Sequence, residues 1–96
     1  MRNEQDEILR ISQEECAEVI QAISKVFRFG FDGEHNGKTN HQRLTEELGD
    51  LLCMIELMMQ LNIVNESAVY KASLQKRNKL HQWSNIFDGQ SDLIIN

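Results

Sequence analysis

Two short acidic motifs contain the residues that are best suited, by type and spacing, to metal binding or catalysis. Segment 14–18 has the sequence EECAE, and segment 46–50 has the sequence EELGD. Like charges three and four residues apart on a helix repel each other, so each motif weakens its own helix. Two copies of such a motif indicate that something positive binds between them. We interpret this partner as a divalent metal ion.

A helical wheel at roughly 100° per residue separates the acids that face inward from those that face solvent. Glu15 falls inside the apolar face of the first helix, and Glu47 falls inside that of the second. Glu18 and Asp50 lie at the edges of these faces. The acids predicted to be solvated surface residues are Glu14, Glu46 and Glu56.

Inward carboxylates need a compensating partner, because burying a charge without one is costly. For any single acid, a position at the edge of the core or a salt bridge is the simpler explanation. Two matched pairs on facing helices can instead surround one or two hard cations with oxygen, which suits Mg²⁺ or Mn²⁺ better than zinc. We therefore predict a Mg²⁺ site, with Mn²⁺ as the alternative, made by Glu15, Glu18, Glu47 and Asp50.

The elements that position these acids are predicted to be helices. The chain has no proline and five glycines, and we find no strand or hairpin signal. We predict an all-α fold and a single domain over residues 1–96, with three main helices at about 4–27, 41–62 and 66–83. Segment 28–40 is then a glycine-containing loop, and the tail 84–96 is either frayed or docked on a partner subunit.

The second predicted helix is apolar over more than half of its circumference. Such a helix is usually covered from several sides, and three helices of this size can hardly cover it alone. We therefore expect a homodimer that completes a four-helix-bundle-type core, with a tetramer as the larger alternative.

Composition excludes several classes of function. The formal charge of −5 argues against nucleic-acid binding, which needs a basic surface. The most apolar run, 48–64, is interrupted by acids and does not resemble a membrane span, and the polar, acidic start of the chain does not resemble a signal peptide. We expect a cytoplasmic protein in which Cys16 and Cys53 are buried thiols.

Basic residues add a weaker signal. Lys76 points out of the middle of the apolar face of the third helix. It either snorkels or pairs with an inward Glu, or it reaches a phosphate held by the metal. Lys25 and Arg28 suit the dipole at the end of the first helix and need no further function.

The two motifs also carry a family resemblance. Glu15-x-x-Glu18, then 28 residues, then Glu47-x-x-Asp50, in a helical chain of this length, resembles the MazG-type nucleotide pyrophosphohydrolases of the all-α NTP pyrophosphatase superfamily. The resemblance covers roughly residues 8–83 and is strongest over the two acidic motifs.

The resemblance implies hydrolysis of a nucleoside triphosphate to the monophosphate and pyrophosphate. The four acids would hold magnesium ions that bind the triphosphate, and one of the four would accept the proton of the attacking water. Lys76 would assist the phosphates. Trp83 or Ser12 would line the base pocket, although ordinary helix packing explains both of these residues as well.

Two other interpretations compete with this one. In the first, the chain is a non-catalytic interaction module whose acids make salt bridges between subunits to Lys76 and Arg77. In the second, it is a di-iron carboxylate bundle. Such a bundle needs Glu-x-x-His pairs, and no histidine of this chain has that spacing.

Overall fold

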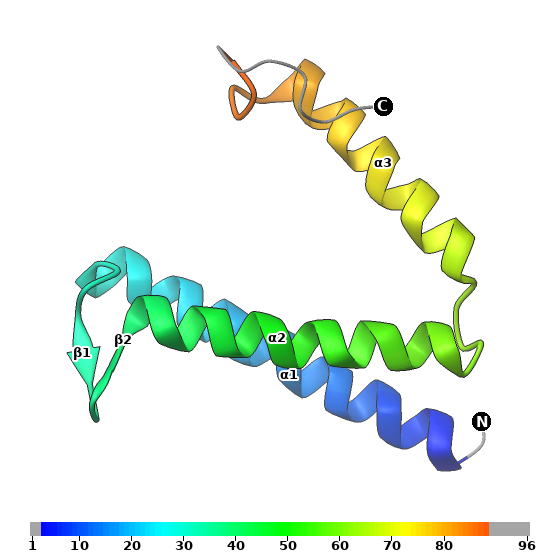
Figure 1. Ribbon diagram of the computed structural model, residues 1–96, viewed down its shortest axis with the longest axis horizontal. Helices are drawn as coiled ribbons and strands as arrows, with labels where there is room; N and C mark the ends of the chain where they lie inside the picture. Colours follow the sequence, from blue (N-terminus) through cyan, green and yellow to red (C-terminus); the bar gives the residue numbers. More distant parts are fainter. Residues whose placement is uncertain (1–2, 89–96) are drawn as a thin grey trace. The chain divides into compact units, whose positions relative to one another are not determined.

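The computed structural model describes residues 3–88 and contains three helices and one short hairpin (Figure 1). In chain order the elements are α1 (Asn3–Phe29), β1 (Glu34–His35), β2 (Lys38–Thr39), α2 (Asn40–Gln60) and α3 (Glu66–Trp83). The predicted all-α class is thereby confirmed. The chain divides between Ile63 and Val64 into two compact units, which are described separately below.

The first unit is built on α1 and α2, which run antiparallel and pack against each other (Figure 1). Its buried apolar side chains are Ile8 and Ala22 from α1 and Met54 from α2. Helix α1 extends two residues beyond its predicted end. It stops where Gly30, at φ +83°, donates its N–H to the carbonyl of Val26, because glycine adopts this left-handed conformation without strain.

A two-stranded antiparallel hairpin lies between the two helices, so our prediction of a plain loop was wrong here. Glu34 pairs with Thr39, and His35 pairs with Lys38. The two tip residues, Asn36 and Gly37, have φ values of +54° and +82°. Asn-Gly is the preferred dipeptide for a two-residue hairpin loop with positive φ at both positions, so the sequence did carry a hairpin signal.

Asn40 ties the start of α2 to the end of α1. Its side chain is 4% exposed and donates from Nδ2 to the carbonyl of Gly30 at 2.9 Å. Its backbone N–H donates to the carbonyl of Gly33, also at 2.9 Å. Thr39 caps the helix in a reciprocal capping box with Gln42. The connection between the helices is therefore fixed at both of its ends.

The second unit contains α3, whose bounds match the prediction. Asn65 caps it by accepting a hydrogen bond from the N–H of Ala68, and its first turn is otherwise exposed. None of the α3 residues is buried. After the helix, Ser84 donates from both its backbone N–H and its hydroxyl to the carbonyl of Leu80. The predicted docking of the tail concerns mainly residues 89–96, which lie outside the described residues.

Several large apolar side chains of the first unit are exposed in the single chain. Ile20 is 68% exposed and Phe27 is 86% exposed on α1, and Leu48 and Leu52 are about half exposed on α2. These residues are candidates for the predicted subunit interface. Both cysteines are exposed as well, so the prediction of buried thiols is wrong for the single chain. Among the described helices, none combines the length and apolarity that a membrane crossing requires.

The buried amide of Asn40 yields a stability prediction. Asn40→Ala removes the 2.9 Å hydrogen bond to the Gly30 carbonyl, which keeps only the longer bond of 3.3 Å from the Gly33 N–H. It should lower the free energy of unfolding by about 1–3 kcal/mol. Urea denaturation measures this change. Asn78→Ala, at an exposed position on α3, is the matched control and should change stability little. Equal stabilities of the two variants would show that Asn40 does not tie the helices together.

The exposed apolar side chains yield a prediction about assembly. Ile20→Lys places a charge at a position that the predicted subunit interface would bury. It should therefore weaken self-association by at least about tenfold. Sedimentation equilibrium measures the association constant. Ser24→Lys adds the same charge at an exposed polar position of α1 and should leave association intact. A wild-type chain that sediments as a monomer would contradict the predicted dimer.

Candidate metal and nucleotide site

Three of the four predicted acids converge in space. Oxygen atoms of Glu15, Glu47 and Asp50 all lie within 4.8 Å of one another. Glu15 and Glu47 are half-buried, and Asp50 is exposed. Because Glu15 comes from α1 and the other two come from α2, it is the packing of the two helices that creates this acidic group.

Glu18 lies next to this group but outside its 4.8 Å limit. It is exposed, one helical turn after Glu15. It lines a small cavity of about 60 Å³ together with Glu47, and it is also one of the charges that act on the Glu47 carboxyl. The structure therefore places all four acids on the facing sides of α1 and α2, with Glu18 at the margin.

The ionisation of the Glu47 carboxyl is perturbed by its surroundings. Burial raises the pKa of its carboxyl above the usual value, and the negative charges of Glu18, Asp50, Glu15 and Glu46 raise it further. Burial disfavours the charged form, and like charges nearby act in the same direction. The group is thus under electrostatic strain that a bound cation would relieve.

The acids assigned to the surface are indeed exposed. Glu14, Glu46 and Glu56 all face solvent. Glu46 also forms an ion pair with Lys38, whose Nζ lies 2.8 and 2.9 Å from its two carboxylate oxygens. Although Glu46 adds to the negative field at Glu47, its own carboxylate is committed to this pair.

The predicted substrate-binding residues lie in different surroundings. Ser12 is buried, and its hydroxyl donates to the carbonyl of Ile8 at 2.7 Å, so its proton is used inside α1. Lys76 and Trp83 are exposed on α3, in the second unit. Their assignment as substrate ligands stays a prediction.

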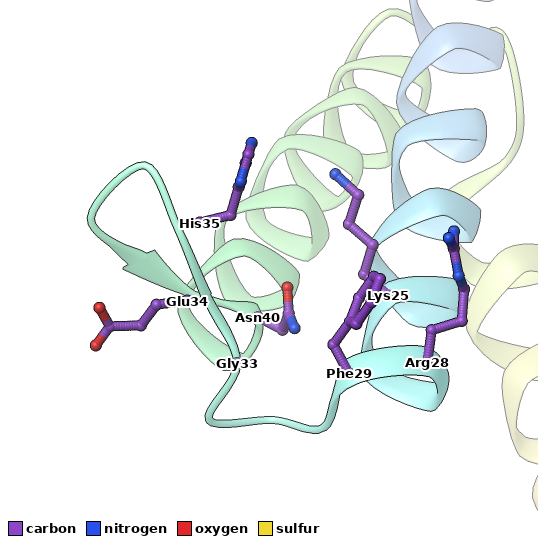
Figure 2. A pocket seen from close by; sticks show the side chains of 7 residues that line it. All are labelled: Lys25, Arg28, Phe29, Gly33, Glu34, His35 and Asn40. Carbon is purple, nitrogen blue, oxygen red and sulfur yellow. The ribbon is translucent and has the colours of Figure 1, made fainter.

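A larger cavity of about 590 Å³ lies between the end of α1 and the hairpin, and sequence patterns did not reveal it (Figure 2). The residues that line it are Lys25, Arg28, Phe29, Gly33, Glu34, His35 and Asn40. Lys25 and Asn40 also line the small acidic cavity. The two cavities therefore adjoin, and together they connect Glu18 and Glu47 to a wall that contains cationic and aromatic side chains.

Side-chain directions give this cavity its chemical character. Lys25 and His35 point to the same side of it, from α1 and from the hairpin, whereas Glu34 points away (Figure 2). The guanidinium carbon of Arg28 lies 4.9 Å from the centre of the Phe29 ring. Gly33 approaches α1 so closely that a Cβ there would lie 2.8 Å from the Phe29 carbonyl oxygen. Only glycine allows this close approach of the hairpin.

The donor set fits a hard divalent cation. It consists of carboxylate oxygens on two helices, and Mg²⁺ and Mn²⁺ prefer oxygen ligands of this kind. The described residues bring no cysteine or histidine into the group, so a site for a softer metal is not favoured.

Comparison with known proteins assigns the family. The chain matches the family model of the MazG nucleotide pyrophosphohydrolase domain over residues 3–83, from the start of α1 to the end of α3. No curated protein and no solved structure matches it significantly. Proteins of this family are generally dependent on a divalent metal and act on nucleotides, in agreement with the acidic group between α1 and α2. The chain belongs to the MazG nucleotide pyrophosphohydrolase family.

Proposed function

We propose that this protein hydrolyses a nucleoside triphosphate to the nucleoside monophosphate and pyrophosphate, using divalent metal ions held by Glu15, Glu18, Glu47 and Asp50. The observation that carries the proposal is the convergence of carboxylate oxygens from both helices within 4.8 Å. Such a cluster of like charges is unfavourable alone and becomes favourable around Mg²⁺.

In phosphoryl transfer the protein contributes mainly by positioning the reactants and by stabilising charge electrostatically. Bound Mg²⁺ supplies neutralisation of phosphate charge and a lower pKa for the attacking water. Water adds to one phosphorus of the α–β linkage, the bond from that phosphorus to the bridging oxygen breaks, and the two phosphate products separate. One carboxylate of the four accepts the proton that the water loses.

The nucleoside part of the substrate is placed in the larger cavity. This cavity shares Lys25 and Asn40 with the acidic one, so a nucleotide whose phosphates lie at the acids can extend into it. The Phe29 ring lines the cavity and offers a surface on which a base can stack.

The activity itself is tested by pyrophosphate release from a panel of canonical and modified nucleoside triphosphates. Turnover should require Mg²⁺ or Mn²⁺. Glu15→Gln and Glu47→Gln should each lower kcat/KM by about a hundredfold or more, because each removes a charged ligand. Glu56→Gln, at an exposed position on α2, should leave the rate unchanged. A well-folded protein that hydrolyses no nucleotide would instead support the interaction module.

Metal binding is also tested without turnover. In EDTA, Glu47→Gln should raise the melting temperature by about 2 °C, because it removes a half-buried charge that its neighbours also repel. Since folding raises the pKa of this carboxyl, its ionisation opposes folding. The difference in melting temperature between the variant and the wild type should therefore grow as pH rises through that pKa.

Added Mg²⁺ should reverse the order of the two melting temperatures. The metal binds the native wild-type protein and stabilises it, whereas the variant has lost a ligand. Glu56→Gln should respond to Mg²⁺ as the wild type does. If Mg²⁺ raises both melting temperatures equally, Glu47 is not a ligand.

A further inference from the structure

Arg43 is a charged residue of the acidic cavity that the metal site does not explain. It lies in α2, one helical turn before Glu47, and lines the small cavity together with Glu47 and Glu18. A guanidinium beside two carboxylates would ordinarily form a salt bridge. Among residues 3–88 the ion pairs are Arg10–Asp6 and Lys38–Glu46, and neither involves Arg43.

The guanidinium of Arg43 is instead held by the hairpin. One terminal nitrogen, Nη2, donates to the carbonyl of His35 at 3.0 Å. Its Nε is shielded from solvent and has no hydrogen-bond partner within the described part of the chain. An unpaired buried N–H on a charged group costs free energy, so this conformation calls for an explanation.

Lys25 places a second positive charge at the same position from the other helix. It lines both the acidic cavity and the larger one, so it lies where the two meet. The acids and the two cations thus approach one space from α1 and α2. A polyphosphate is the kind of ligand that needs both, because metal ions bridge some of its oxygens and leave others for direct hydrogen bonds.

We propose that Arg43, together with Lys25, binds phosphate oxygens of the substrate and of the pyrophosphate product. This inference rests on the proposed function, which supplies the polyphosphate. The planar guanidinium suits phosphate because its parallel N–H groups match two oxygens at once. The hairpin then has a role in binding, since the His35 carbonyl fixes the orientation of this guanidinium.

The test is direct binding of inorganic pyrophosphate with Mg²⁺ to the full chain, measured by calorimetry. Arg43→Gln should weaken pyrophosphate binding by about tenfold or more, as expected for the loss of a charged hydrogen bond. Arg43→Lys should recover part of the affinity, because it restores the positive charge but not the parallel N–H groups of the guanidinium. Arg10→Gln removes an equal charge at an exposed site on α1 and should change nothing.

A second variant separates phosphate binding from nucleoside binding. Phe29→Ala removes the aromatic wall of the larger cavity and should raise KM for the triphosphate while leaving pyrophosphate affinity unchanged. Arg43→Gln should impair both. A purely structural role would appear as a lower melting temperature with unchanged pyrophosphate affinity in the folded variant, and this result would overturn the inference.

The outcomes also separate this inference from the proposed function. If the wild type hydrolyses nucleotides but Arg43→Gln binds pyrophosphate normally, the role of Arg43 is wrong and the enzyme assignment stands. If no nucleotide is hydrolysed but pyrophosphate binding depends on Arg43, the polyphosphate site stands without the hydrolase. A wild type that neither hydrolyses nucleotides nor binds pyrophosphate overturns both.

Discussion

Mutual repulsion among the acids of α1 and α2 is the constraint on which the rest of the site depends. The packing that brings Glu15, Glu47 and Asp50 together also concentrates their charge. Burial first, and these neighbouring charges second, raise the pKa of the Glu47 carboxyl. The apolar burial that opposes this repulsion is small in the single chain, with Ile8, Ala22 and Met54 as its buried members. With a cation bound, each of these carboxylates would be attracted to the ion, and this attraction would offset their mutual repulsion.

The order of the site residues follows from how the two helices are joined. Asn40 anchors the start of α2 to the last turn of α1 through both its side chain and its backbone. Seven residues later on the same helix comes Glu47, and Arg43 lies between them. A connection fixed in this way leaves little freedom for the two acidic motifs to slide past each other, so the carboxylates meet in one register.

Sequence periodicity predicted the acidic group well because a helix converts spacing directly into direction. Glu15 and Glu47 were selected by lying within apolar faces, and two helices that bury those faces against each other must bring such acids together. Glu18 was predicted as an equal member, yet its oxygens lie outside the group. A wheel gives direction around an axis, and it does not give distance to another element.

The sequence pattern did not predict the surroundings of Lys25 and Arg43, because these are formed by contacts between elements far apart along the chain. Lys25 was attributed to the helix dipole, although it lies where two cavities meet. Arg43 stands four residues before Glu47, a spacing that puts both on one side of α2, but only the hairpin explains its orientation. The Asn36-Gly37 dipeptide would have predicted that hairpin, had it been weighed above the general scarcity of strand residues.

The hairpin tip also determines where this chain can accommodate change. Asn36 and Gly37 are exposed, and a Cβ at Gly37 would meet open space, whereas Gly33 has no room for a side chain and Asn40 is buried. Extra residues inserted at the tip would lengthen a loop at small entropic cost. The same insertion at either base would move one acidic motif relative to the other. Insertions and deletions among relatives of this chain should therefore occur mainly at the hairpin turn. The number of residues between Asn40 and Glu47 should stay constant.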